Sequence, residues 1–162
     1  AMVNDVLRSG NVAEQALRQE KRLRIDKLIA EVIDDYMLLA KTRGMTFEVN
    51  TEPATISANR DMMRHVISNL ASNAVRHGDT GSVITITCDQ HELAIENACR
   101  PLTRKQLQHV FDPFYRNNAT TKQYADSSGI GLYTVKMLLD AKGLDYDFTP
   151  HGRGMRFVVR FE

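Results

Sequence analysis

The feature that most constrains the fold is a set of three segments whose apolar residues recur at helical spacing on one side only. The segments are 26–40, 59–77 and 129–142, and the glycines that follow them are Gly44, Gly78 and Gly143. Asp26 and Asn59 are typical helix N-caps. The apolar positions of the first two are Leu28, Ile29, Val32, Ile33, Tyr36, Met37, Ala40, Met62, Met63, Val66, Ile67, Leu70 and Ala74. Each predicted helix must bury its apolar side against another layer.

Short β-rich segments separate these helices and supply that layer. The expected strands are 46–49, 55–57, 83–88, 93–96, 146–148 and 156–161, with a hairpin turn at Asp89-Gln90 and a short helix near 103–110. We therefore predict an α+β fold: a two-layer α/β sandwich in which three helices cover one face of a mixed sheet of about five to six strands. A doubly wound parallel sheet fits this order less well.

Composition excludes several classes of function. The chain has 162 residues, with 21 basic against 20 acidic side chains, so no overall field would recruit nucleic acid or an anionic membrane. Two isolated cysteines form neither a zinc motif nor a disulfide framework, which favours a reducing cytosol. We found no apolar run near the roughly 20 residues of a membrane span. Any phosphate recognition must therefore be local.

One helix carries a polar stripe that can hold a metal-bound phosphate. Asn69 and Asn73 are spaced i,i+4, and Arg76 and His77 continue that face by another turn. An amide oxygen is a hard, neutral ligand suited to Mg²⁺, and a guanidinium can grip two phosphate oxygens. The alternative is an ordinary solvated helix face.

Two further motifs flank a long polar segment at 115–128. Ser127-Ser-Gly-Ile-Gly-Leu132 opens the third helix, where free backbone amides make an anion site, although it could equally be flexible punctuation. Phe111-Asp-Pro-Phe-Tyr-Arg116 places two aromatic residues before the polar segment, either as an anchor for a mobile loop or as core aromatics.

The order of these motifs resembles the ATP-binding catalytic domain of bacterial sensor histidine kinases, over roughly residues 26–162. The matching series is Asn69-x-x-x-Asn73-Ala-x-Arg76-His77, Phe111-Asp-Pro-Phe-Tyr-Arg116, Gly129-Ile-Gly131-Leu132 and Gly152-x-Gly154-x-x-Phe157. In that family these are the N, F and glycine boxes of the Bergerat ATP-binding fold. Residues 1–25 are then expected to be a cloning remnant at Ala1-Met2, the tail of a dimerisation helix and a linker.

The resemblance implies roles for individual residues in binding ATP and Mg²⁺. Asn73 would coordinate the metal, and Asn69 and Arg116 would act in catalysis beside the phosphates. Nucleotide contacts would come from Asn69, Asn73, Arg76, His77, Asn97, Leu102, Arg116, Lys122, Gly129, Ile130, Gly131 and Leu132.

The sequence also departs from the family pattern where the adenine is read. The first glycine box, usually Asp-x-Gly-x-Gly, falls on Asn97-Ala-Cys99-Arg-Pro101. The Asn97 amide oxygen could still accept from the adenine amino group, as the family's Asp does, but it lacks the charge. Neither Cys99 nor Pro101 has the conformational range of glycine.

The leading hypothesis is a protein-histidine kinase domain that donates the γ-phosphoryl of ATP to a histidine on a dimerisation domain, for relay to a response regulator. None of the five histidines lies in a phosphoacceptor motif, so this chain alone should not autophosphorylate. We expect a monomer here, a homodimer for the full-length protein, and a cytoplasmic location as part of a membrane-anchored sensor. The alternatives are a degenerate module with weak ATP affinity, and an anti-sigma serine kinase, which the Phe111 motif and long polar segment disfavour.

Overall fold

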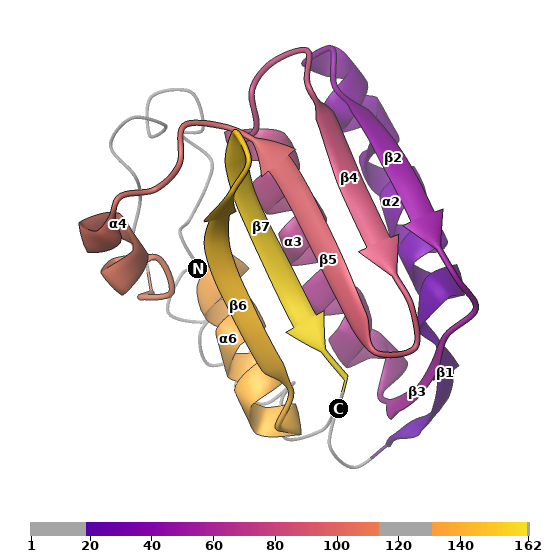
Figure 1. Cartoon of the computed structure of the whole chain (residues 1–162). Helices are drawn as coiled ribbons and strands as arrows, with labels where there is room; N and C mark the ends of the chain where they lie inside the picture. Colours follow the sequence, from indigo (N-terminus) through magenta and orange to yellow (C-terminus); the bar gives the residue numbers. More distant parts are fainter. Residues whose placement is uncertain (1–18, 114–130, 162) are drawn as a thin grey trace.

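The computed structural model describes residues 19–113 and 131–161 and has two layers. A five-stranded sheet in the order β2-β4-β5-β7-β6 forms one layer, and α2, α3 and α6 lie behind it as the other (Figure 1). The elements in chain order are β1 (Lys21–Arg24), α2 (Ile25–Thr42), β2 (Thr46–Thr51), β3 (Thr55–Ala58), α3 (Arg60–His77), β4 (Val83–Cys88), β5 (Glu92–Ala98), α4 (Arg104–His109), α6 (Gly131–Lys142), β6 (Asp145–His151) and β7 (Gly154–Arg160). The predicted two-layer α+β sandwich is confirmed.

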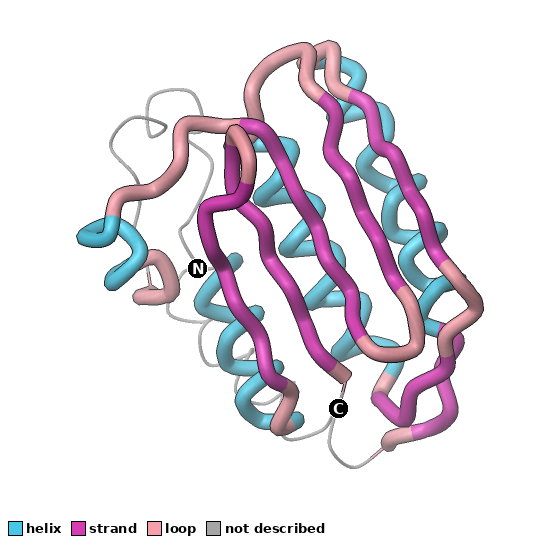
Figure 2. Tube along the Cα trace, in the orientation of Figure 1, coloured by secondary structure: helices cyan, strands magenta, loops and turns pink. Residues whose placement is uncertain are grey.

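The sheet is mixed because one pair of strands is parallel. β2 runs parallel to β4, with Thr46 opposite Val83, whereas β4–β5, β5–β7 and β7–β6 are antiparallel. Figure 2 shows these strands as a single layer in front of the helices. The predicted hairpin turn forms between β4 and β5, where the Asp89 carboxylate accepts from the backbone N–H groups of His91 (2.8 Å) and Glu92 (2.9 Å).

Helix α3 is the middle helix of the second layer. It packs against α2 on one side and α6 on the other, and it also contacts β5. The Asn59 side chain caps its start by accepting from Met62 N at 3.0 Å, as predicted, and Gly78 follows its last residue. Its fully buried side chains include Met62, Met63 and Val66. Burial of this stripe leaves the remaining polar side chains of α3 at the borders with its neighbours.

The start of α2 differs from the sequence prediction. Asp26 is not the N-cap: Arg24 occupies that position, and Asp26 lies in the first turn. The Asp26 carboxylate instead accepts from Arg24 Nε (2.9 Å) and Nη2 (2.7 Å) and from the backbone N–H of Ala54 (3.1 Å). Favourable charge at the helix start explains why an acid suits the first turn as well as the cap.

Strand β1 was not predicted. It pairs antiparallel with β3 in a separate two-stranded sheet, with Lys21 opposite Ala58 and Arg24 opposite Thr55. Three of its four side chains are exposed and basic, which is why the sequence suggested a solvated linker. Leu23 is the exception, because it is buried in the core.

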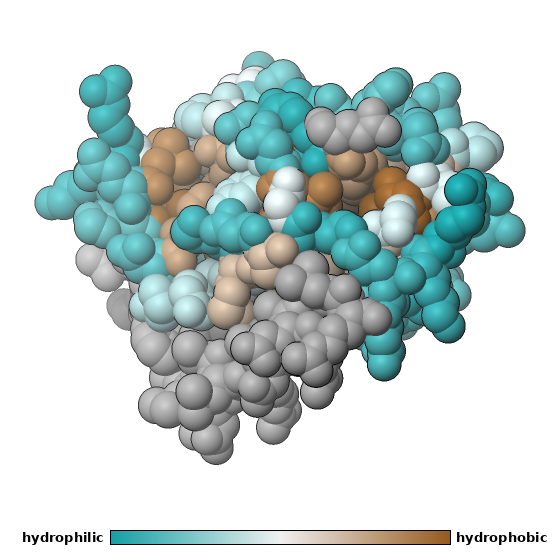
Figure 3. Space-filling view, turned by 90° about the horizontal axis from the view of Figure 1, so that it is seen from below, coloured by the Kyte–Doolittle hydropathy of each residue, from teal (hydrophilic) through white to brown (hydrophobic). Residues whose placement is uncertain are grey.

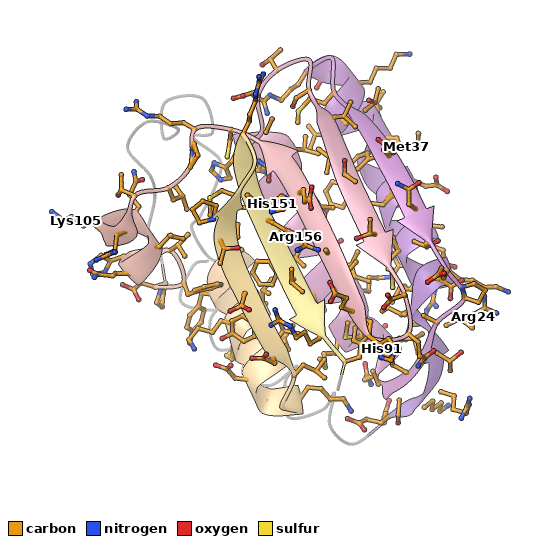
Figure 4. All side chains as sticks on the ribbon, in the orientation of Figure 1. Arg24, Met37, His91, Lys105, His151 and Arg156 are labelled. Atoms are coloured by element: carbon orange, nitrogen blue, oxygen red, sulfur yellow. The ribbon has the colours of Figure 1, made fainter. Side chains whose placement is uncertain are left out.

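Met37 is also placed differently from the prediction. It is 54% exposed, whereas Ile33 and Ala40 on the same helix are buried. In Figure 4 Met37 lies beside β2 at the edge of the sheet. The side chain therefore stands at the rim of the apolar stripe of α2, where the sheet no longer covers it.

The end of the molecule where α6 and β7 finish shows small apolar areas among hydrophilic side chains (Figure 3). Within residues 19–113 and 131–161, no helix has the length and hydropathy that a membrane span requires.

Replacing Asp26 should test the anchor at the start of α2. Asp26→Ala should lower the free energy of unfolding at pH 7 by about 1 kcal/mol, because the Ala54 N–H loses its acceptor and the exposed Arg24 partner adds little. Hydrogen bonds from Arg24 hold the pKa of Asp26 well below its usual range. The contribution is thus complete at neutral pH and is lost as pH falls below the ordinary aspartate range towards the lowered pKa.

Urea unfolding followed by circular dichroism at several pH values measures this effect. Asp34→Ala, at an exposed position on the same helix, is the matched control. A difference between wild type and Asp26→Ala that stays constant into strong acid would contradict the assignment.

Candidate nucleotide-binding site

The polar stripe predicted on α3 faces the start of α6. A Cβ added to Gly131 would lie 4.0 Å from Asn69 Oδ1, so the Asn69 amide reaches the first residue of α6. Asn73 lies one turn further along α3, and both side chains are half-buried. The structure thus brings Asn69, the first N-box amide, to the second glycine of the Gly129-Ile-Gly131 turn, some sixty residues away in the sequence.

Arg76 is held along α3 by a residue that the sequence analysis missed. Its Nε donates to Ser72 Oγ at 3.0 Å, one helical turn earlier. The i,i+4 spacing of these two residues could have revealed the contact. The bond orients the guanidinium on the same helix that carries Asn69 and Asn73.

His77 closes the last turn of α3 as a neutral ring. Burial, followed by the charges of Arg76 and Arg43, lowers the pKa of His77 below its ordinary value. Arg43, from the loop after α2, donates to the Val75 carbonyl and to Thr80 Oγ1 (3.3 Å). It therefore binds a carbonyl that the helix end leaves free, a role that only the tertiary fold reveals.

The end of α3 packs directly on β5 near Asn97. A Cβ added to Gly78 would lie 2.6 Å from the Ala74 carbonyl oxygen, which requires glycine at the end of the helix, and 3.5 Å from Asn97 Cβ, an ordinary contact distance that places Gly78 beside the strand. Among the described residues the buried polar side chains are Asn97, 9% exposed, and Thr134 in α6. The predicted base-reading residue therefore lies in the core at the end of the helix that carries the polar stripe.

The turn after β5 is fixed by backbone hydrogen bonds. Asp79 N–H donates to the Ala98 carbonyl at 2.7 Å, and Cys99 N–H donates to the Arg153 carbonyl at 3.1 Å. Burial and the nearby Asp79 charge raise the pKa of the half-buried Cys99 thiol. The altered glycine box thus forms an ordered turn without its glycines.

Some of the remaining predicted site residues lie among the residues that the structure describes, and others do not. Leu102 is half-buried in the segment before α4, and Leu132 packs against the core from the first turn of α6. Predictions for Arg116, Lys122, Gly129 and Ile130 lie outside the described residues. Clusters of three or more His, Cys, Asp or Glu side chains able to hold a metal ion are absent from residues 19–113 and 131–161.

Phe111 is a core aromatic. Its ring makes edge contacts with Tyr146 (5.8 Å between centroids), Phe148 (6.4 Å) and Phe157 (6.2 Å) on β6 and β7. These contacts fix the chain just after α4 has ended, a few residues before the polar segment at 115–128. The two alternatives for Phe111 are therefore compatible, because a core aromatic at this position is also an anchor for the chain.

The face of the sheet away from the helices carries charged side chains that pair with one another. Arg156 on β7 lies 3.1 Å from Glu96 and 3.6 Å from Glu92 on β5, and His151 lies 3.6 Å from Glu96. Figure 4 shows Arg156 and His151 on the side of the sheet away from the helices. The approach of Asn69 to Gly131 and the buried Asn97 are on the helix-facing side, which makes that side the candidate site.

Comparison with known proteins identifies the family of this chain. Residues 58–162, which include α3, β5, α6 and both antiparallel strands after it, match the family described as histidine kinase-, DNA gyrase B- and HSP90-like ATPase. The chain belongs to this ATPase family, and the resemblance to the catalytic domain of a sensor histidine kinase is confirmed. Binding of ATP is the shared property of this family.

Curated relatives are named as sensor kinases. The chain is 31% identical over 159 residues to sensor histidine protein kinase HK06 of Streptococcus pneumoniae, covering 98% of this chain and 35% of that protein. It is also 31% identical over 163 residues to sensor histidine kinase CusS of Escherichia coli, covering 98% and 34%. The chain thus spans about a third of the length of these relatives.

Solved structures share the fold. The catalytic domain of histidine kinase ThkA superposes with a TM-score of 0.74 at 19% identity, covering 88% of this chain and 95% of that one. Full-length ShkA in complex with AMPPNP gives a TM-score of 0.79 at 21% identity, covering 99% and 35%. These identities establish the architecture alone.

Replacing each glycine of the pair Gly152 and Gly154 should show how closely β7 packs against Asn97. A Cβ on Gly154 would lie 1.8 Å from the Asn97 carbonyl oxygen and 2.8 Å from Ala98 Cα. Gly154→Ala should therefore lower the free energy of unfolding by about 3 kcal/mol or more, because backbone rather than a side-chain tip must move. Gly152→Ala is the control: φ is +56° and nothing lies within 4 Å, so strain alone should cost about 1 kcal/mol. Equal effects in thermal unfolding would refute the packing argument.

The neutral His77 ring predicts a pH dependence of stability. Because its pKa is lowered in the folded state, the unfolded chain binds the proton more readily, and stability falls as pH drops through the ordinary histidine range. His77→Gln should reduce this loss between about pH 7 and pH 5. Denaturant unfolding measures it, with His91→Gln at an exposed turn position as the control. An NMR titration placing His77 above 6.5 would contradict the burial argument.

Proposed function

We propose that this chain binds ATP together with Mg²⁺ along α3, with the phosphates at Asn69, Asn73 and Arg76 and the base at Asn97. The observation that carries the proposal is the approach of Gly131 to Asn69, which sets the start of α6 beside the amide stripe. Free backbone N–H groups at a helix start favour a phosphate, and amide oxygens suit a magnesium ion that keeps phosphate oxygens in its shell. Gly78 and Asn97 adjoin the far end of the same stripe.

The residues of the site fit a bound metal. Asn73 is a neutral oxygen donor on a rigid helix, and its half-buried amide would take one position of the metal shell. When bound, Mg²⁺ would neutralise phosphate charge during transfer. Arg76, oriented by Ser72, would hold phosphate oxygens, and Asn69 would complete the polar stripe. Leu102, Leu132 and the neutral His77 would border the nucleotide.

The reaction would be transfer of the γ-phosphoryl to a histidine on a dimerisation domain of the same full-length protein, followed by relay to a response regulator. Phosphoryl transfer depends mainly on positioning and charge stabilisation, which this set of amides and cations supplies. Arg116, Lys122, Gly129 and Ile130 would complete the phosphate contacts. The full-length protein would be a homodimeric, membrane-anchored sensor, with this chain in the cytoplasm and its catalytic domain at 26–162.

Substitution of Asn73 tests the metal end of this proposal. Asn73→Ala should abolish binding of Mg·ATP while the fold stays intact, because a half-exposed amide contributes little to stability. Isothermal titration calorimetry measures the affinity, and circular dichroism checks the fold. Asn50→Ala, on the exposed edge strand β2, is the matched control and should bind as wild type does. An unchanged dissociation constant in Asn73→Ala would remove this residue from the metal site; no binding by wild type would reject the kinase function for this chain.

A further inference from the structure

The two edge strands of the five-stranded sheet, β2 and β6, differ in how well they are protected against another strand. β6 contains Pro150, which has no N–H to donate, and two aspartates. Proline and charged side chains are the usual protection of a sheet edge. β2 has no proline and one charged side chain, Glu48, and five of its six residues are exposed. No described strand pairs with its outer side (Figure 1), so β2 is the open edge.

The pairing of β2 with β4 shows which backbone groups remain on the open side. Thr46 N–H donates to the Ser82 carbonyl (3.3 Å), and the N–H of the sixth residue after it, Glu52, donates to the Cys88 carbonyl (2.9 Å). Backbone groups of successive residues in a strand point in opposite directions, so the even-numbered residues of β2 are bonded to β4. The N–H and carbonyl groups of the odd-numbered residues, Phe47, Val49 and Thr51, therefore point outward.

The side chains of this edge form one apolar and one polar side. Phe47 and Val49 lie opposite buried isoleucines of β4, which places them on the helix-facing side, and Val49 is still 38% exposed. The exposed Met37 of α2 lies beside the same strand (Figure 4). On the other side, Asn50 Nδ2 lies 3.4 Å from Glu48 Oε1. The edge thus combines free backbone groups with exposed apolar surface and a complementary amide and carboxylate.

These features are complementary to a second copy of the same edge. Antiparallel pairing about a twofold axis at Val49 would set Val49 opposite Val49 and Phe47 opposite Thr51, so all the outward backbone groups would meet as hydrogen-bonded pairs. Glu48 would then lie opposite Asn50 of the other copy, and each amide could donate to a carboxylate. An axis at Glu48 would instead set two carboxylates directly opposite each other, which is unfavourable.

We propose that β2 is an interaction surface for a second copy of this chain, paired antiparallel about an axis at Val49 so that two sheets join into one. The contact is small beside the roughly 1,200 Å² of stable interfaces, so it is weak and the dilute chain is a monomer. If the proposed full-length homodimer holds two copies together, their effective concentration is on the order of millimolar, which favours pairing. Since α2 lies between β2 and the α3–α6 pair, the candidate nucleotide site stays open.

Sedimentation equilibrium of the full chain without nucleotide tests this proposal. At concentrations rising to on the order of 1 mM, monomer and dimer should be in exchange. Hydrogen exchange followed by NMR locates the contact: the amides of Phe47, Val49 and Thr51 should become protected as concentration rises, whereas those of Glu48 and Asn50, bonded to β4, should be protected throughout. A chain that stays monomeric, or a dimer that protects another segment instead, would overturn the proposal.

Two substitutions should shift the association in opposite directions. Val49→Pro removes an outward N–H from each copy while leaving the bonds to β4 in place, so the dissociation constant should rise about tenfold or more. Asn50→Lys should lower it about fivefold, because each introduced cation faces Glu48 of the other copy.

Thr149→Lys on the exposed side of β6 is the matched control, since it adds the same charge at the other edge and should leave the dissociation constant unchanged. Circular dichroism confirms folding of each variant. An Asn50→Lys variant that associates no more tightly than Thr149→Lys would contradict the axis at Val49. Because these measurements contain no nucleotide, their failure leaves the proposed ATP binding untouched, and failure to bind ATP leaves the pairing untouched.

Discussion

The structure depends on the burial of α3 between two helices and a sheet. Its apolar side chains fill the core against β5, while α2 and α6 cover its sides. This arrangement leaves one strip of the helix facing the start of α6, and the polar residues fall on that strip. Because the packing that stabilises the fold also sets the direction of Asn69 and Asn73, the site is a consequence of how α3 is buried rather than a separate addition.

Close backbone contacts complete the same arrangement at the end of α3. Gly78 avoids a clash with the Ala74 carbonyl where the helix ends beside Asn97, and Gly154 lets β7 approach the carbonyl of Asn97. Both glycines are needed for space, since neither has a positive φ. The backbone of the buried Asn97 between them is therefore fixed in position.

The sequence predicted much of this fold because its helices are one-sided and α3 begins at a well-formed cap. The period of α2 and α3, Asn59 as a cap and the hairpin at Asp89 all rest on local chemistry, and the structure agrees with them. Strand β1 could not be predicted, since Lys21, Arg22 and Arg24 are polar in the manner of a linker and become a strand only by pairing with β3. Asp26 was misplaced by two positions because an acid is favourable at a cap and in a first turn alike.

For the candidate site, spacing within a helix and the order of motifs led to Asn69, Asn73, Arg76 and Gly131, and the structure places Asn69 beside Gly131. The close approach of Gly154 to the Asn97 carbonyl could not be predicted, because it depends on how β7 pairs with β5. The support of α3 by Arg43 likewise comes from a loop far away in the sequence.

The central claim is that a metal-bound nucleotide lies along α3, with its phosphates near Asn69 and its base near Asn97 on β5. An NMR titration of the isotope-labelled chain with Mg·ATP tests this claim most directly. Amide shifts should concentrate at residues 69–78, 97–102 and 131–134. Thr55–Ser57 and Gly143–Leu144, which border a hollow at the other end of the molecule, should stay unmoved. Shifts centred on that other end, or none at saturating nucleotide, would contradict the account.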